Sequence, residues 1–170
     1  MKLLQTIYDQ DIFPDYVEGE KIEYRKREAA RAIVVDDQGL IALMNVSNCG
    51  YHKLPGGGLQ DDEGAPTALA RELLEEIGCK AIIQKEVGEI IEYRNEFNQV
   101  HYNYCFIAKL TGEKGEPNLE DDEIENGFKI MWVSIDEAIK LLSTDIADNY
   151  HGKFVLARDL IFLTEAKKIL

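Results

Sequence analysis

Basic residues are scarce in this chain of 170 residues. Lys and Arg total 19 against 32 Asp and Glu, which gives a formal net charge of −13. Nucleic acids and anionic membranes attract proteins through positive charge, so this balance argues against a nucleic acid polymer or a membrane as partner. If the substrate is itself an anion, positive charge must be recruited locally, and a metal ion is the obvious source.

Cysteines are few and widely spaced: Cys49, Cys79 and Cys105 form neither a disulfide framework nor a CxxC zinc pattern. Reduced thiols in the cytoplasm are therefore expected. The first apolar run is broken at Gln5 and again at Asp9, which does not fit a signal peptide. No stretch approaches the roughly 20 apolar residues of a membrane-spanning helix. The sequence predicts a cytoplasmic protein.

Apolar residues make up 45% of the chain and charged residues 30%, which is typical of a globular domain. The length predicts one domain over 1–170, with 1–25 as an N-terminal arm or strand. Apolar runs predict strands at 29–35, 40–46, 81–94, 100–110 and 130–135, and helices at 65–77, from Ser134 or Asp136, and at 155–169. Residues 111–126 are expected to form a long loop. This order predicts an α/β fold, a mixed β-sheet with helices on both faces.

The predicted helix 65–77 carries an unusual concentration of acids. On a helical wheel Glu72, Glu75 and Glu76 share an arc of about 100° beside the apolar face, with Arg71 on its flank. Like charges this close repel, yet clustered carboxylates are what Mg²⁺ requires, because it prefers oxygen ligands. An acidic helix face is also common as ordinary solvated surface, so the pattern alone leaves both interpretations open.

Three consecutive glycines, Gly56, Gly57 and Gly58, precede this helix. Without a Cβ atom they let the backbone and its amide groups approach a phosphate closely, although such a run can equally form a simple turn. Glu63, just before the helix, could add a fourth acid to the site.

The joint spacing of these residues resembles the box of the Nudix hydrolase family, G-x5-E-x7-R-E-U-x-E-E-x-G-U, with U a bulky aliphatic residue. The box spans 57–79 and is matched by Gly57, Glu63, Arg71-Glu72-Leu73, Glu75-Glu76 and Gly78. The last U position departs from the pattern because it holds Cys79, and Gln60 and Asp62 stand where many members have glutamate and glycine.

The resemblance implies an α/β/α sandwich that hydrolyses nucleoside diphosphates linked to a further group X, with Mg²⁺ as cofactor and Mn²⁺ as a possible substitute. Carried over by position, Glu72, Glu75 and Glu76 are the metal ligands, and Arg71 orients them through charge-assisted hydrogen bonds. Glu63 would support the loop or the metal shell. A homodimer is a plausible assembly for the family.

The mechanism expected is in-line attack by water on a phosphorus atom of a nucleotide anhydride. Glu75 or Glu76 is the nearest candidate for the base that takes the proton from water. Family members differ in where this base lies, and the acidic segment 120–125 offers Glu123 as the alternative. That segment could equally be a solvated loop.

Substrate choice is the least determined inference. The short chain favours a nucleoside triphosphate, possibly with an oxidised purine, cleaved to monophosphate and pyrophosphate. ADP-ribose or nucleotide sugars, dinucleoside polyphosphates and a non-catalytic nucleotide-sensing role stay open. A base could stack on one of six aromatic residues that could also belong to the core: Tyr93, Phe97, Tyr102, Tyr104, Phe128 and Trp132.

Overall fold

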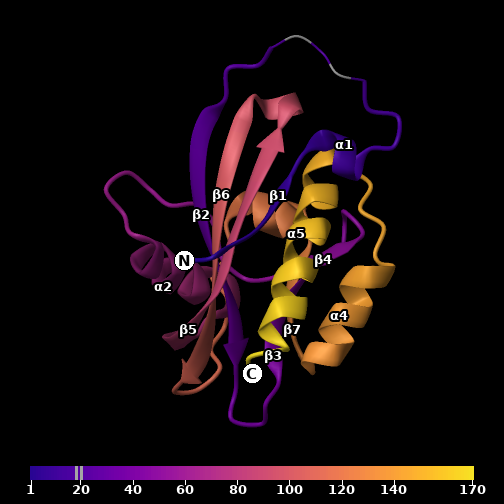
Figure 1. Cartoon of the computed structure of the whole chain (residues 1–170). Helices are drawn as coiled ribbons and strands as arrows, with labels where there is room; N and C mark the ends of the chain where they lie inside the picture. Colours follow the sequence, from indigo (N-terminus) through magenta and orange to yellow (C-terminus); the bar gives the residue numbers. More distant parts are fainter. Residues whose placement is uncertain (18, 20) are drawn as a thin grey trace.

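The computed structural model of the chain describes residues 1–17, 19 and 21–170 (Figure 1). Its strands are β1 (Leu3–Ile7), β2 (Arg25–Val35), β3 (Ile41–Val46), β4 (Tyr51–Lys53), β5 (Lys80–Arg94), β6 (Gln99–Thr111) and β7 (Phe128–Val133). Its helices are α1 (Asp9–Ile12), α2 (Ala65–Ile77), the 3₁₀ turn η1 (Asn95–Phe97), α3 (Asp121–Glu125), α4 (Ile135–Thr144) and α5 (Tyr150–Ala166). None of the helices in this part of the chain has the length and apolar character required to cross a bilayer.

The strands form one mixed sheet in the order β1-β5-β6-β2-β3-β4, with β7 paired to β3. β2 runs parallel to β6 along its whole length, whereas its pairing with β3 is limited to Val35 and Ile41. The two strands then separate, and the segment 54–59 takes the free edge of β2. Ala30 N donates to Gly57 O and Leu59 N to Glu28 O, at 3.0 and 2.9 Å. The glycine segment therefore lies directly beside β2.

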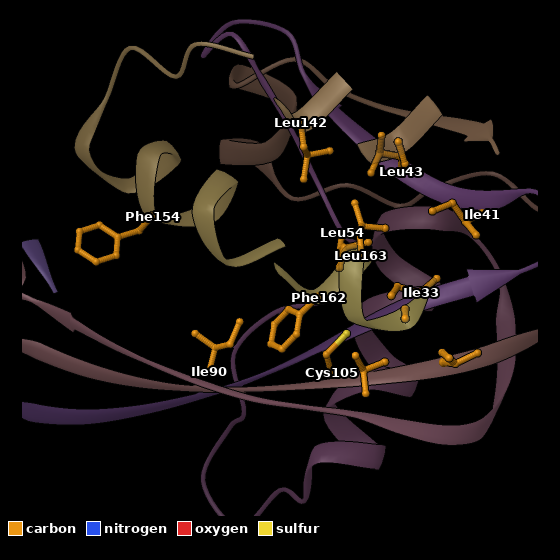
Figure 2. Close-up of a cluster of buried hydrophobic side chains, with 14 of the residues drawn as sticks. Ile33, Ile41, Leu43, Leu54, Ile90, Cys105, Leu142, Phe154, Phe162 and Leu163 are labelled. Atoms are coloured by element: carbon orange, nitrogen blue, oxygen red, sulfur yellow. The ribbon is translucent and has the colours of Figure 1, made fainter. Parts of the chain in front are cut away.

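Helices cover both faces of the sheet, as predicted. On one face α4 and α5 pack over a core that includes Ile33, Cys105 and Phe162 (Figure 2). On the other face Leu69 and Leu73 of α2 are buried in a second cluster. Figure 1 shows α2 and the α4–α5 pair on opposite sides of the strands. The α/β/α sandwich inferred from the sequence is the observed fold.

Helix α2 has the predicted bounds. Pro66 stands in its first turn, where a missing N–H is tolerated, and Gly78 ends it in the left-handed conformation with φ of 62°. Cys79, the departure from the family pattern, is 1% exposed and packs in the α2 cluster like the aliphatic residue it replaces. The apolar face of α2 fixes its rotation, and the acidic face is thereby directed to the gap beside β2.

Several predicted elements differ from the structure. The long loop expected over 111–126 ends in the short helix α3, begun by a capping box between Glu120 and Glu123. The strand β4 was not predicted, since three residues carry too little periodicity. α5 begins at Tyr150, five residues before the predicted start, because the Asn149 side chain caps it by accepting from Gly152 N at 2.7 Å.

The predicted N-terminal arm contains β1, which adds to the sheet in parallel with β5. Residues 18 and 20 of the arm lie outside the described residues. The three cysteines are free thiols.

Candidate functional site

A cavity of about 480 Å³ lies where the acidic face of α2, the glycine segment, β2, β4 and α3 meet. It is lined by Arg27, Arg31, Cys49, Tyr51, Lys53, Gly56, Gly57, Gly58, Glu72, Glu76, Glu96, Phe97, Glu120, Asp122, Glu123, Asn126, Phe128, Asn149, Tyr150 and His151. The cavity therefore combines carboxylates, basic groups, backbone glycines and aromatic rings, the groups needed to hold a charged and partly aromatic ligand.

Arg71 ties the box together from the flank of the helix. Its Nε and Nη2 donate to the Glu63 carboxylate at 3.2 and 2.9 Å, and Nη1 donates to Glu72 Oε1 at 2.7 Å. Nη2 also donates to the carbonyl oxygen of Gly58, at 3.0 Å. One guanidinium group thus contacts Glu63, Glu72 and the glycine segment together.

Glu76 points into the cavity although it is only 1% exposed. Its carboxylate accepts from Gly56 N at 2.6 Å and from Lys53 Nζ at 2.5 Å. Lys53 lies in turn over the ring of Phe128, 4.7 Å from its centre. Glu76 is therefore a buried, positioned anion whose counter-charge is a single lysine.

Glu123 of α3 lies close to Glu76 in the same cavity. Burial and the nearby negative charge of Glu76 raise the pKa of Glu123 to about 7, although a hydrogen bond from Glu120 N acts in the other direction. Two carboxyl groups held together in a partly buried cavity form a site that a cation would stabilise.

Glu72 completes the acidic wall. A Cβ atom on Gly57 would overlap with its carboxylate, so a larger residue at this position would displace the Glu72 side chain. Burial raises the pKa of Glu72, and the charge of Glu76 adds to that effect, while the hydrogen bond from Arg71 opposes it. Glycine at this position thus lets the Glu72 carboxylate lie against the backbone of the glycine segment.

Basic groups form the facing wall. Arg31 on β2 has a buried Nε without a hydrogen-bond partner among the described residues. Burial is the main reason that its pKa falls to about 10, so it is charged at neutral pH. Arg27 lies four positions before Arg31, on the same face of the strand, and also lines the cavity. Arg27 and Arg31 line the same cavity as the carboxylates, and neither forms an ion pair with them among the described residues. Their guanidinium groups suit the binding of phosphate oxygens.

The structure does not bring all the predicted site residues together. Glu75 lies outside the cavity, with Arg71 Nη1 3.4 Å from its Oε2. Of the aromatic candidates, Phe97 and Phe128 line the cavity. The other four lie elsewhere: Tyr93 stacks on Tyr8, Tyr102 lies under Lys26, Tyr104 donates to Glu28, and Trp132 lies under Lys114.

Sequence reasoning missed the basic wall. Arg27 and Arg31 share one face of β2 with Ala29, Ile33 and Val35, and this interruption of an apolar face was the available signal. Lys53 adjoins the glycine segment but belongs to a strand too short to be predicted.

The donor set fits a divalent cation in its chemistry. Glu72, Glu76 and Glu123 supply carboxylate oxygens, which hard cations prefer, and the close approach of Glu76 and Glu123 calls for positive charge between them. Within residues 1–17, 19 and 21–170, no three Asp, Glu, His or Cys side chains are already gathered as ligands of one ion. Arg71 and Lys53 hold the glutamates instead.

Comparison with known proteins identifies the family of the chain. The model of the NUDIX domain matches residues 25–155. Nudix hydrolase 13, mitochondrial, from Arabidopsis thaliana is 26% identical over 128 residues, which cover 71% of this chain and 63% of that protein. Diphosphoinositol polyphosphate phosphohydrolase 3-alpha from Mus musculus is 32% identical over 91 residues, covering 52% of this chain and 51% of that protein. The match to this chain thus covers between half and two thirds of the length of these relatives.

A solved structure has the same fold. The MutT protein from Methanosarcina mazei Go1 superposes with a TM-score of 0.59 at 20% identity, covering 86% of this chain and 99% of that one. The family model covers most of the chain and includes every residue of the box, from Gly57 to Cys79. The chain therefore belongs to the Nudix hydrolase family.

Proposed function

We propose that the chain is a divalent-metal-dependent hydrolase that cleaves a phosphoanhydride bond in a nucleoside diphosphate linked to another group. The observation that carries the proposal is the convergence of Glu72, Glu76 and Glu123 on one cavity whose facing wall holds Arg27 and Arg31. Carboxylates suit the cation and the arginines suit the phosphates, so one cavity accommodates both partners of the reaction.

The metal would be held by Glu72 and Glu76, with Glu75 as a further ligand if its contact with Arg71 is released. Mg²⁺ is the expected ion and Mn²⁺ a substitute. When bound, the ion offsets the negative charge of the phosphate oxygens and makes water a better nucleophile. Arg71 keeps Glu72 oriented for this role, and the amide of Gly56 does the same for Glu76.

The base would be Glu123 or Glu76, both of which line the cavity, rather than Glu75, which does not. Either carboxylate accepts the proton of the attacking water, while Arg27, Arg31 and the exposed backbone of the glycine segment bind the phosphates. Glu123→Gln losing far more activity than Glu75→Gln would place the base in α3; near-normal turnover of Glu123→Gln would leave Glu76 of α2 as the base.

For the substrate we propose a nucleoside triphosphate, possibly an oxidised purine, cleaved to monophosphate and pyrophosphate. Phe97 and Phe128 line the cavity and offer faces on which a base could stack. A release profile tests this choice: pyrophosphate with a mononucleotide supports a triphosphate, whereas AMP with ribose phosphate supports ADP-ribose. A cytoplasmic location and a homodimer stay predictions.

Glu76→Gln tests the proposed function. The amide cannot balance the charge of a cation, so turnover with Mg²⁺ is expected to fall by about 10³-fold or more. Activity would be measured with a panel of nucleoside triphosphates, nucleotide sugars and dinucleoside polyphosphates, in Mg²⁺ and in Mn²⁺.

The matched control is Glu113→Gln, which removes one exposed carboxylate away from the cavity and should retain normal turnover. Near-normal activity of Glu76→Gln would refute the proposed site. Binding of the same nucleotides without turnover in the unaltered chain would favour the sensing role instead.

A further inference from the structure

A second cavity, of about 550 Å³, opens beside the first and shares Arg27, Glu96, Phe97 and His151 with it. The first cavity is rich in carboxylates, whereas the second is lined by Arg25, Arg27 and Arg94 against Glu96 alone among the described residues. In a chain of net charge −13, such a concentration of arginine is unexpected. Its position next to the proposed catalytic cavity indicates a role in binding an anion.

The sheet itself builds this basic surface. β2, β6 and β5 are neighbouring strands, and residues directly opposite one another project from the same face. Arg25 pairs with Gln99, which pairs with Arg94, so these three form one row. In the next row Arg27 pairs with His101. The basic side chains are thus presented by rigid strands rather than by a loop.

The charge of Arg94 is already compensated, whereas that of Arg25 and Arg27 is not. Arg94 Nη2 lies 2.7 Å from Glu92 Oε2, and both residues are buried. Arg25 and Arg27 are exposed and make no ion pair within the part of the chain that the structure describes. Two unpaired guanidinium groups facing one cavity repel each other unless an anion lies between them.

His151 adds a neutral donor at the junction of the two cavities. Its Nδ1 lies 2.9 Å from Nη1 of Arg94. A guanidinium group can only donate, so Nδ1 must accept, and the proton of the neutral ring is on Nε2. His151 is exposed, so this N–H is free to donate to a ligand oxygen. Guanidinium groups together with a neutral N–H donor can donate hydrogen bonds to several oxygens of one phosphate group.

We infer that this second cavity is a subsite for an additional phosphate group, carried by the substrate at a distance from the anhydride that is cleaved. The inference rests on the proposed function for its link to catalysis. Glu96, at the junction, disfavours the anion and so limits its affinity. The extra phosphate could belong to a nucleotide ribose or to a polyphosphorylated polyol, and both present the same chemistry to Arg25 and Arg27.

The test measures binding without turnover, by isothermal titration calorimetry of the full chain in EDTA. The probes are adenosine 3′,5′-bisphosphate for the nucleotide source and inositol hexakisphosphate for the polyol source; the tighter ligand identifies the source. The double variant Arg25→Gln/Arg27→Gln should weaken that ligand by about tenfold or more. Glu96→Gln should strengthen it severalfold, because the opposing charge is removed.

Lys26→Gln is the matched control. It removes the same charge from the same strand, but Lys26 projects from the other face, where it pairs with Glu28 at 3.0 Å. Binding should change by less than about twofold. An equal loss of affinity in Lys26→Gln and in the Arg25→Gln/Arg27→Gln variant would overturn the subsite. The absence of binding of either probe to the unaltered chain would overturn it as well.

Turnover then separates this inference from the proposed function. ADP-ribose is compared with its 2′-phosphate, and the ratio of kcat/KM for the phosphorylated over the plain substrate should fall about tenfold in the arginine variants. Anion binding at Arg25 and Arg27 without any hydrolysis would refute the proposed function and leave the subsite intact. Hydrolysis with an unchanged ratio in the arginine variants would refute the subsite and leave the function intact.

Discussion

At the scale of single residues, Lys53 holds together the acidic part of the cavity. Among the described residues, Lys53 is the only lysine or arginine that forms an ion pair with Glu76. The Lys53 side chain is 12% exposed and the Glu76 side chain 2%. Glu123 lies near both Glu76 and Lys53. Lys53 therefore balances the negative charge that a metal ion would otherwise balance. Metal binding to Glu76 would compete with this ion pair, so the ion pair connects the stability of the site with its metal affinity.

We expect Lys53→Met to lower the free energy of unfolding by about 2–4 kcal/mol in EDTA, because it leaves a buried carboxylate without its partner. Mg²⁺ should restore more stability to this variant than to the unaltered chain, since the same carboxylate becomes free to bind the ion. Urea denaturation with and without Mg²⁺ measures both effects.

Lys109→Met is the control for this change. Lys109 pairs with Asp37 at 3.1 Å in solvent, so its loss should cost less than about 1 kcal/mol. A Lys53→Met variant as stable as this control in EDTA would contradict the importance of the ion pair.

At the scale of elements, the end of α2 positions more than the helix itself. Asn118 N donates to the carbonyl oxygen of Glu75 at 2.8 Å, and Gly115 and Glu116 contact Gly78. The same segment continues into α3, which carries Glu123. The close approach at Gly78 therefore helps to place a cavity residue more than forty positions along the chain.

Gly78→Ala should lower the free energy of unfolding by about 1–2 kcal/mol or more. Its φ is 62°, and a Cβ atom would lie 2.5 Å from the Glu116 carbonyl oxygen. Gly64→Ala at the other end of α2 is the comparison, because φ is −83° there and the nearest atom, Pro66 Cδ, is 3.9 Å away. The melting temperatures of both variants are compared by thermal unfolding. Equal melting temperatures would show that a side chain at position 78 causes no more strain than one at position 64.

The elements also show which parts of the fold and of the candidate site the sequence predicts. α2 was predicted with its bounds because its signals are local: the apolar period, a proline at the start and a glycine at the end. The approach of Glu123 to Glu76 was not predictable from spacing, since it depends on how segment 111–120 packs on α2. Likewise, the charged residues of β2 acquire a role only once β2 separates from β3 and the glycine segment fills the gap.

At the scale of the whole molecule, the carboxylates and the arginines that line the two cavities come from different elements. The carboxylates gather at α2 and α3, and the arginines gather where β2, β5 and β6 meet. Buried polar groups connect this region to α5: Arg158 Nε donates to Asp159 Oδ1 at 2.7 Å, and Asp159 accepts from Leu54 N at 2.8 Å. The helix α5 is thereby linked through Leu54 to the start of the glycine segment.

His101 makes the stability of the whole molecule depend on pH. Burial, then the charges of Arg94 and Arg27, lower its pKa from 6.5 to about 2, although Glu92 lies 3.9 Å from its Nδ1. Below pH 6.5 the unfolded chain therefore binds a proton that the folded chain does not. Stability should fall by about 1 kcal/mol between pH 7 and pH 5.5 on account of this residue.

His101→Gln should remove that part of the pH dependence, because the amide does not titrate and can still donate to Gln99. Urea denaturation of both chains at pH 7 and pH 5.5 gives the difference. A variant with the same loss of stability over this interval as the unaltered chain would show that His101 is protonated in the folded state.

The central claim is that the carboxylates of α2 hold a divalent cation in the cavity that they share with Glu123. Crystals soaked in Mn²⁺, examined by anomalous scattering, test it most directly. The account predicts a peak within coordinating distance of Glu72 and Glu76, with the ammonium group of Lys53 displaced from Glu76. Well-ordered glutamates still held by Arg71 and Lys53, with no peak between them at saturating Mn²⁺, would contradict it.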